Sequence, residues 1–459
     1  MTRPIRHIIP HAPQSAPARE SRLRVKTAAG SPRRVVHKPL TAVNKASLAG
    51  AHAKKVQHKK AIVLYMHVHQ PYRIRNYTIF DAGQNHDYFD GSYDSRESNE
   101  RILHKVAEKS YLPTNARLLK LLNEHPEFKV SMSITGTVLE QLERWSPEAL
   151  QSFKDVVATG QVEIVAETYH HSLAFFYSRS EFEAQVQMHR EKIQELFGQT
   201  PQVFRNTELA YNNDLAYWAD QAGYKGILAE GWDKVLGWRS PNYVYRPSYT
   251  NNIRLLMKNY KLSDDIAFRF GDQNWAEWPL TADKFTHWLN AEPEATNFNL
   301  FMDYETFGEH QWDESGIFSF LEHLPKEWLK TSGNTFMTVS EAIDAFPAKD
   351  YVDSPQTITW ADTERDLSAW LGNAMQQEAI HALYGLQERI IGTGDLALIE
   401  DFRRLQTSDH VYYMCTKWFN DGDIHAYFSP YETPYEAFVN FMNAYHDLIF
   451  RLKQKGIEV

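Results

Sequence analysis

The sequence predicts an α/β fold built on a parallel sheet or barrel and followed by a helical C-terminal part. From about residue 61 onward, short apolar runs with strand character alternate with segments of helical periodicity. This alternation is typical of parallel α/β sheets and barrels. From about Leu367 the pattern becomes helical, most clearly at residues 374–385 and 437–454. A chain of 459 residues is long enough for two or three domains and a large core.

Strand and helix signals can be assigned in order along the first part of the chain. The apolar run at residues 61–66 predicts a strand. Residues 112–124 have apolar side chains at helical spacing, and Pro113 suits the first turn of that helix. Ser146 and Gly198 suit the start of one helix and the end of another. By the same criteria we expect strands at residues 128–134, 161–166 and 224–229, and helices at residues 139–145, 147–158, 180–197 and 214–222.

Two carboxylates follow the apolar run at residues 298–302, which predicts a short buried strand. Asp303 and Glu305 come next, and Gly308 marks the start of a loop. Residues two apart on an extended chain share one face, so we expect both acids to face the same cavity. Carboxylates held together raise the pKa of one of them, which keeps a general acid protonated near neutral pH. The same pattern also occurs in surface turns.

A third carboxylate, Glu208, follows another strand signal at residues 202–207. Several strand–helix units separate it from Asp303. In a parallel barrel, catalytic side chains come from the carboxyl ends of different strands. Glu208 and Asp303 are therefore suited to two-carboxylate glycoside chemistry. The alternative is that Glu208 only precedes a helix, where the helix dipole favours an acid.

Histidines follow two of the predicted strands. His67 and His69 end the first strand and share a face, and Pro71 cannot continue a central strand. The pair His170-His171 follows the strand signal at residues 161–166. Such histidines can bind a metal, contact sugar hydroxyls, or be unrelated polar residues at a strand end. Because no cysteine or acid stands beside His67 and His69 at metal-binding spacing, we expect no metal.

Five segments carry these motifs in a fixed order: HVHQPY at 67–72, GQVEIVAETYHH at 160–171, RNTELAY at 205–211, FMDYETFG at 301–308 and RDLSAWLGNAMQ at 365–376. Together they resemble the ordered sequence regions of glycoside hydrolase family 57, in its α-amylase-like branch. Residues 407–418 and 430–438 resemble the same branch, so the resemblance extends from about residue 60 to the C-terminus. It implies an α/β fold with an incomplete (β/α)7 barrel at residues 61–350, followed by a helical domain at residues 351–459 that closes the cleft.

The resemblance also implies roles for individual residues. The family acts on α-glucans with retention, using a Glu nucleophile and an Asp acid/base, which Glu208 and Asp303 match. The expected substrate-binding residues are His67, His69, His170 and Glu305. In the last region, Asp366, Trp370 and Asn373 are present, and none is assigned as the functional equivalent of the aspartate found in other branches.

Aromatic side chains are plentiful, with 12 Trp, 24 Tyr and 25 Phe. Their rings suit the apolar faces of sugars, although most aromatic residues belong to cores. Some tryptophans stand near Gly, Pro or acidic residues instead of inside apolar runs, which makes them candidates for the cleft: Trp232, Trp275, Trp278, Trp360 and Trp370. Of these, we expect Trp232, Trp275 and Trp370 to bind substrate.

Charge and cysteine content limit the possible partners and compartment. Residues 1–60 contain 14 Lys or Arg and one acid, Glu20, whereas the whole chain has a net charge of −9. We expect residues 1–60 to be a disordered basic arm; an organellar transit peptide is the alternative. The acidic remainder argues against nucleic-acid binding. The single cysteine, Cys415, favours a reducing, cytoplasmic location, and no apolar run has transmembrane length.

The two carboxylates predict glycoside chemistry, and the resemblance implies that the protein is a retaining α-glucan-active hydrolase that cleaves α-1,4-glucosidic bonds by double displacement. Its partner would be an α-glucan, and we expect no cofactor. A related alternative is a 4-α-glucanotransferase or an α-glucan branching enzyme, in which another glucan replaces water as the acceptor. Alternatives of other classes are a metal-dependent polysaccharide deacetylase and a non-catalytic α-glucan-binding protein. The sequence predicts no oligomeric state.

Overall fold

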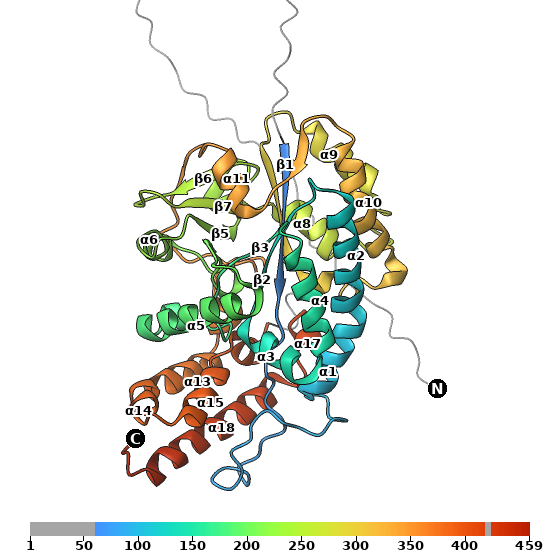
Figure 1. Cartoon of the computed structure of the whole chain (residues 1–459). Helices are drawn as coiled ribbons and strands as arrows, with labels where there is room; N and C mark the ends of the chain where they lie inside the picture. Colours follow the sequence, from blue (N-terminus) through green and yellow to red (C-terminus); the bar gives the residue numbers. More distant parts are fainter. Residues whose placement is uncertain (1–59, 418–423) are drawn as a thin grey trace, which may run out of the picture. The chain divides into compact units, whose positions relative to one another are not determined.

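The computed structural model of the chain describes residues 60–417 and 424–459. The basic arm expected at residues 1–60 therefore lies, except for Lys60, outside the described residues. The described residues belong to one compact unit, and Figure 1 shows the course of the chain through it.

In the described part of the chain, seven parallel strands form an incomplete barrel. Four of them pair in the order β3-β2-β1-β8, and β7, β5 and β4 pair in a second sheet. Short contacts join the two groups: Ala166 bridges to Phe204, and the Asn259 amide donates to the Asn299 carbonyl at 2.8 Å. The strands are β1 (Lys60–Val68), β2 (Val130–Ile134), β3 (Val162–Ile164), β4 (Val203–Phe204), β5 (Gly226–Glu230), β7 (Arg254–Lys258) and β8 (Asn297–Asp303).

Three further strands lie beside this barrel. β9 (Asn334–Phe336) pairs in parallel with the start of β1. β6 (Val244–Pro247) is antiparallel to β7, and β10 (Tyr351–Val352) is parallel to β6.

Helices connect the strands and cover the barrel (Figure 1). A π-helical turn (Ala107–Tyr111) separates the first two helices. The helices up to residue 345 are α1 (Asn99–Val106), α2 (Leu112–Glu124), α3 (Gly136–Trp145), α4 (Pro147–Ala158), α5 (Arg179–Phe197), α6 (Asn213–Gln221), α7 (Asp233–Leu236), α8 (Tyr260–Ala267), α9 (Ala282–Ala291), α10 (Ile317–Leu329) and α11 (Val339–Ala345). The strand–helix alternation expected from the sequence is confirmed.

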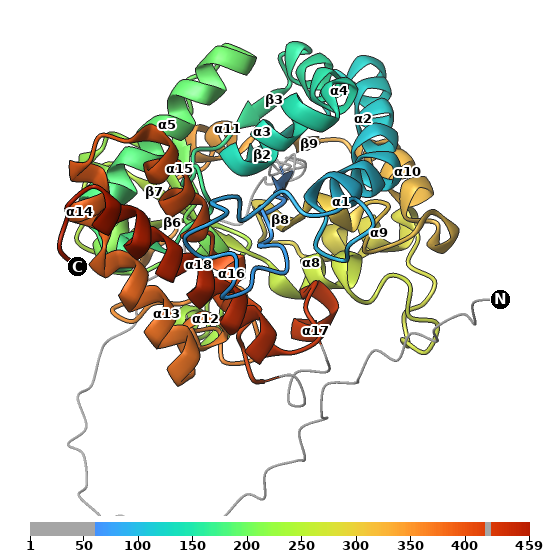
Figure 2. The ribbon, with the colours of Figure 1, turned by 90° about the horizontal axis from the view of Figure 1, so that it is seen from below.

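After β10 the chain is helical, as the sequence predicts. These helices are α12 (Ser368–Leu371), α13 (Ala374–Gly385), α14 (Gln387–Gly392), α15 (Leu396–Leu405), α16 (Ser408–Tyr412), α17 (Ile424–Phe428) and α18 (Pro434–Gln454). In Figure 1, β1 points toward them with its carboxyl end, and Figure 2 shows them from below. Because all described residues form one unit, a domain boundary at residue 350 stays a prediction.

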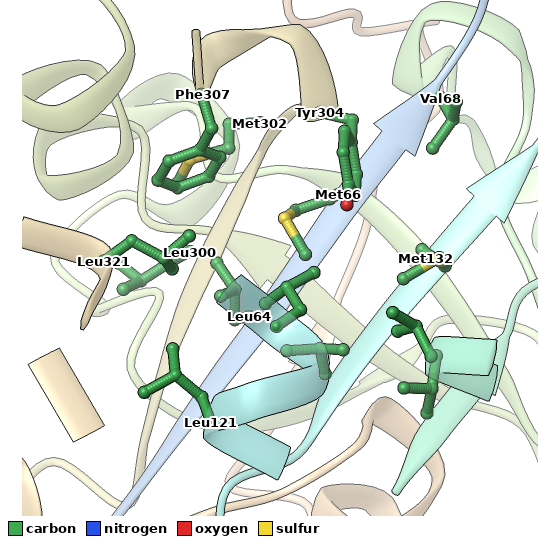
Figure 3. Packing of buried hydrophobic residues seen from close by; sticks show 14 of the residues in the cluster. Leu64, Met66, Val68, Leu121, Met132, Leu300, Met302, Tyr304, Phe307 and Leu321 are labelled. Carbon is green, nitrogen blue, oxygen red and sulfur yellow. The ribbon is translucent and has the colours of Figure 1, made fainter. Parts of the chain in front are cut away.

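Both faces of β1 are buried, and its side chains alternate between two cores. Leu64, Met66 and Val68 pack outward against the helices around the barrel (Figure 3). Val63 and Tyr65 belong to a separate cluster inside the barrel. Because side chains on a strand alternate with period two, the next inward position after Tyr65 is His67. The strand thus carries a histidine to the inner end of the barrel.

Gly308 is a sensitive point in the loop after β8. Its φ is +105°, and a Cβ there would lie 2.0 Å from the Lys109 carbonyl oxygen and 2.9 Å from the Phe318 ring. We expect Gly308→Ala to destabilise the fold by about 3 kcal/mol, because it adds a steric clash to an unfavourable φ. Urea unfolding measures this difference.

Gly316→Ala is the matched control for that experiment. Gly316 also has a positive φ, +85°, but a Cβ there meets nothing within 4 Å. Its cost should be about 1 kcal/mol, from backbone conformation alone. Equal losses for the two variants would contradict the close packing assigned to Gly308.

Candidate active site

A cavity of about 330 Å³ lies at the carboxyl ends of the barrel strands. Both the strand ends and the segment after the barrel contribute side chains to it. The lining includes His67, His69, His171, Glu208, Asp303, Glu305, Trp360, Trp370 and Asp409. Three carboxylates known from the sequence motifs, Glu208, Asp303 and Glu305, therefore share one cavity.

Asp303 and His67 face each other across neighbouring strands. They are register partners in the parallel β1–β8 pair, and His67 Nδ1 lies 3.6 Å from Asp303 Oδ1. The other ring nitrogen of His67 lies 3.2 Å from the fully buried Glu167. Burial and Arg205 lower the pKa of His67, but Glu167 and Asp303 outweigh them and raise it overall. Burial alone would raise the pKa of Asp303, whereas its contact with His67 lowers it.

Glu305 places a second carboxyl group near Asp303. It lies in the short 3₁₀ helix Tyr304–Thr306 and is buried. The hydroxyl of Tyr111, at the end of the π-helical turn, donates a 2.5 Å hydrogen bond to its Oε1. Burial and, second, the charge of Asp303 raise the pKa of Glu305 to about 7. The sequence predicted that the pKa of one acid of this pair is raised, and in this structure it is the pKa of Glu305.

Glu208 lies in a strained turn instead of at a strand end. β4 ends at Phe204, and Glu208 follows in the 3₁₀ helix Thr207–Leu209 with φ +59°. A positive φ costs a residue with a Cβ free energy, and such strain is often found at functional sites. The Trp360 indole N–H donates to Glu208 Oε2 at 2.8 Å, and the Ser408 hydroxyl donates to Oε1 at 3.1 Å. Burial raises the pKa of Glu208 to about 7, although Arg205 opposes this shift.

The helical segment α16 supplies part of the cleft. Its first residue, Ser408, contacts Glu208, and its second, Asp409, lies 3.0 Å from His69 Nε2. The other ring nitrogen of His69 lies 2.9 Å from the Thr135 hydroxyl. Burial lowers the pKa of His69, and its hydrogen bond to Asp409 helps to lower the pKa of that carboxyl against the effect of burial. His69 is thus fixed from both sides.

Three imidazoles form a stack in the cleft. The ring of His171 lies 4.0 Å from that of His69 and 4.9 Å from that of His67, with interplanar angles of 21° and 23°. An Arg205 N–H contacts His171 Nε2 at 3.2 Å, so this nitrogen acts as the acceptor. The proton of the neutral ring is then on Nδ1, which faces the Ser408 hydroxyl at 3.1 Å. Burial, with the neighbouring cationic groups, keeps the pKa of His171 well below its ordinary value.

Among the described residues, two groups of side chains have the composition of a metal site: His67, Glu167 and His171, and His69, His171 and Asp409. A metal must lie in the plane of each imidazole that binds it, about 2 Å from the nitrogen. Rings stacked nearly parallel direct their lone pairs alongside one another and not toward one point. The Arg205 cation also contacts Glu167 and His171. This arrangement therefore does not fit a metal ion.

The structure brings together most of the predicted site residues, but not all of them. His67, His69, Glu208, Asp303, Glu305 and Trp370 line the cavity. His170, Trp232 and Trp275 are not part of its lining. His170 is fully buried with its ring 4.8 Å from that of Tyr169, and no hydrogen-bond partner for its nitrogens occurs among the described residues. Trp232 packs against the core around β5 and Trp275 against the core around α9.

Other residues of the cleft were not predicted. His171 occupies the position expected of His170, because its backbone has φ +50° and turns the side chain into the cavity. The HH doublet was the only signal for it. Ser408 and Asp409 belong to a helical segment, so strand-end reasoning did not find them. For Trp360 the sequence predicts a place in the cleft without a specific role.

The chain matches the sequence profile of a known family. The sequence profile described as glycosyl hydrolase family 57 matches residues 63–355, which is more than half of the chain. The chain belongs to this family. It is therefore a glycoside hydrolase, as the motifs predicted. In the described part of this family 57 chain, no helix has both the length and the apolar character to cross a membrane.

Relatives support the assignment to family 57. A protein of Methanocaldococcus jannaschii, provisionally named an α-amylase, is 42% identical over 86% of this chain and 85% of its own. A branching enzyme from Thermococcus kodakaraensis has a TM-score of 0.59 at 12% identity, covering 77% of this chain and 86% of its own. A family 57-type branching enzyme from Pyrococcus horikoshii also has a TM-score of 0.59, at 16% identity, covering 80% and 87%. These structures confirm the predicted (β/α) barrel fold with a helical C-terminal part.

The neighbouring histidines provide a matched test of the site. His171→Phe keeps an aromatic ring in the stack but removes both nitrogens, so we expect kcat/KM on a glucan to fall by about 100-fold. His170→Phe removes two ring nitrogens without a hydrogen-bond partner in the described part of the chain, so kcat/KM should change by less than about twofold. Steady-state kinetics on folded protein, checked by circular dichroism, measures both. A larger loss for His170→Phe would contradict this placement of the site.

Proposed function

We propose that this family 57 enzyme cleaves α-1,4-glucosidic bonds of α-glucans with retention of configuration. One observation carries the proposal: Glu208 and Asp303, delivered by different parts of the barrel, line the same cavity beside a stack of histidines. The activities after which the reported relatives are named, α-amylase and branching enzyme, support an α-glucan as the substrate class. Starch or glycogen as the natural polymer and a cytoplasmic location are further parts of this proposal.

In the first step, Glu208 attacks the anomeric carbon while Asp303 protonates the glycosidic oxygen. The Trp360 indole and the Ser408 hydroxyl each bind one oxygen of the Glu208 carboxylate, which fixes its orientation for attack. In the second step, Asp303 accepts a proton from water, and the oxygen of that water displaces Glu208 from the sugar. Two inversions at the same carbon give net retention.

The free enzyme must change its ionisation before it reacts. Double displacement requires an ionised Glu208 and a protonated Asp303, but the pKa of Glu208 is about 7 and that of Asp303 is lowered. The Asp303 side chain is 36% exposed, so a bound sugar would displace water from it and raise its pKa. Positive charge that develops on the sugar ring would favour the ionised form of Glu208.

The histidines complete this proposal. Neutral His69 and His171 line the cavity and can exchange hydrogen bonds with sugar hydroxyls in place of their present partners. His67 differs from them, because two carboxylates raise its pKa. Its charge beside Asp303 would stabilise the ionised aspartate left after proton transfer to the leaving group.

Substitution of Glu208 and substitution of Asp303 should impair different steps of the reaction. Glu208→Gln cannot form the glycosyl-enzyme, so kcat should fall on the order of 10⁴-fold or more on every donor. Asp303→Asn should lose most of its activity on natural glucans, which need a protonated leaving group. It should still form the intermediate from an α-maltosyl fluoride and then stall, because its base is missing. Burst kinetics with the fluoride distinguishes the two variants.

Azide provides the control for that experiment. Azide needs no general base, so it should displace the sugar from the glycosyl-enzyme of Asp303→Asn. The product should be the α-maltosyl azide. With Glu208→Gly, azide should attack from the vacated face and give the β-azide. Loss of activity on all donors in both variants, without rescue by azide, would show that the roles are wrong.

A test for a metal separates this proposal from a polysaccharide deacetylase. Because the stacked imidazoles do not converge on one point, we expect incubation with EDTA to leave at least about 90% of the activity on amylose. Elemental analysis should find less than stoichiometric zinc. Activity that is lost to the chelator and restored by a divalent ion would favour metal-dependent chemistry.

A second candidate function, transfer of the glucosyl group to another sugar, is favoured by two phenylalanines of the cavity. Phe268 and Phe428 line the cavity yet remain 46% and 36% exposed. The Phe428 ring lies 5.6 Å from that of His310, whose backbone N–H donates to the Glu305 carbonyl. Phe428 therefore lies near the segment that carries Asp303 and Glu305, where a leaving or accepting sugar would bind, and Phe268 lines the same cavity. Aromatic faces bind sugars and exclude water.

Partition between water and sugar acceptors tests the role of these rings. With maltotriose as donor and acceptor, Phe268→Ala and Phe428→Ala should each lower the ratio of transfer to hydrolysis by about three- to tenfold. Phe80→Ala is the control, because Phe80 is 84% exposed and does not line the cavity. Quantitative chromatography of products by chain length gives the ratio. An unchanged ratio in both cavity variants would leave hydrolysis as the sole activity supported.

A further inference from the structure

The segment at residues 358–367 is attached to the barrel at several points. Ile358 and Tyr211 exchange two backbone hydrogen bonds of 2.9 Å. The backbone N–H of Trp360 donates to the Glu208 carbonyl at 3.2 Å, and its indole N–H donates to the Glu208 carboxylate at 2.8 Å. Trp360 is therefore hydrogen-bonded to both the backbone and the side chain of Glu208.

Arg365 contacts both other residues of this segment and the barrel. Its Nη1 donates to the Trp360 carbonyl at 2.7 Å and to Glu230 Oε2 at 2.9 Å. The Arg365 carbonyl accepts from the Thr359 N–H at 2.9 Å. The guanidinium carbon lies 4.7 Å from the centre of the Tyr260 ring. These contacts hold Arg365 in a left-handed conformation, with φ +53°, that is uncommon for residues other than glycine.

Glu230 is a rigid partner for Arg365. It is the last residue of β5 and is fully buried. Its Oε1 accepts a 2.7 Å hydrogen bond from the Gly231 N–H, so its carboxylate is oriented by the backbone. A nearby cation, Lys258, lies 3.9 Å away but has a closer partner in Asp264, at 3.2 Å. Arg365 is therefore the side chain that contacts Glu230 most closely.

A buried ion pair of this kind contributes little net stability, because both charges lose their hydration. The pair therefore has a better explanation in what it positions. The contact from Arg365 to the Trp360 carbonyl fixes the backbone from which the indole projects. The indole N–H in turn contacts the carboxylate that is proposed to attack the sugar.

We propose that Arg365 and Glu230 are a positioning pair that holds Trp360 so that its indole N–H binds the ionised carboxylate of Glu208. This inference rests on the proposed nucleophilic role of Glu208. Neither Arg365 nor Glu230 contacts Glu208 in the described structure, and the path from the pair to Glu208 runs through Trp360. Arg365 also lines the cavity, whereas Glu230 does not, so Glu230→Gln tests the pair without removing a group that can touch the sugar. Glu230, Glu208 and the Arg365–Trp360 segment thus connect β5, the turn after β4 and the segment that leads into the C-terminal helices.

The sign of its effect follows from the hydrogen bond. A donor that binds the ionised form of a carboxylate lowers its pKa. Loss of the Trp360 contact should therefore raise the pH at which Glu208 ionises, and kcat/KM should fall off at a higher pH on the acid side. One hydrogen bond of ordinary strength corresponds to a shift of about 0.5–1 pH unit.

The test is the pH dependence of kcat/KM on an activated α-maltoside for four variants. The acid limb is the part of the profile where kcat/KM falls as the pH decreases. Trp360→Phe and Arg365→Lys should each move this limb to a higher pH, by about 0.5–1 pH unit. Lysine keeps the positive charge, so the shift cannot come from lost charge. The double variant Arg365→Lys/Trp360→Phe should move no further than Trp360→Phe alone. Glu230→Gln should also move the limb upward, whereas the lost negative charge alone would move it downward.

Arg269→Lys is the matched control, because Arg269 pairs with Asp265 and does not line the cavity. Its acid limb should stay in place. Loss of activity that is uniform across pH in Arg365→Lys, or a shift that adds to that of Trp360→Phe, would overturn the proposal. If Glu208 is not the nucleophile, the result would be different: Glu208→Gln would keep its activity, and the acid limb of its pH profile would stay in place.

Discussion

The Glu208 carboxylate is held between the barrel and the segment that follows it, and the cleft depends on this contact. The turn after β4 presents Glu208 with a positive φ, which is unfavourable in isolation. Trp360 and Ser408, which come after the barrel strands in the sequence, each donate a hydrogen bond to one oxygen of the Glu208 carboxylate. Their hydrogen bonds compensate for the strain and fix the direction in which the carboxylate points.

The same enclosure sets the electrostatics of the site. Burial raises the pKa of Glu208 and of Glu305 to about 7, while His67 lowers that of Asp303. An open barrel end would leave these carboxyls in water, with ordinary pKa values. The helical part therefore contributes chemistry as well as shape, because Asp409 and Ser408 complete the surroundings of His69 and Glu208.

Strand–helix alternation predicted a parallel sheet or barrel, and the resemblance to family 57 implied the incomplete barrel. Strand-end reasoning pointed to Asp303 and Glu305, because the period-two alternation of a strand is a local property of sequence. It was less accurate for Glu208, which lies in a turn beyond the end of β4. The sequence did not predict that β1 and β8 are neighbours, and their register is what places His67 opposite Asp303. The same reasoning could not choose between His170 and His171, since the strand has ended and a positive φ at residue 171 decides which ring enters the cavity. Flanking composition did not locate Trp232 or Trp275, because it says nothing about where a side chain points. Contacts from helices far along the chain, such as that of Ser408, depend on tertiary structure.

Trapping of the covalent intermediate tests the central claim most directly. A 5-fluoroglycosyl fluoride that carries the α-glucosyl specificity should form a slowly hydrolysed adduct with the enzyme. Peptide mass spectrometry should then find one label, on Glu208, and prior incubation with a maltooligosaccharide should slow its formation. A label on Asp303, on Glu305 or on any other residue would contradict the account, as would full turnover without an adduct.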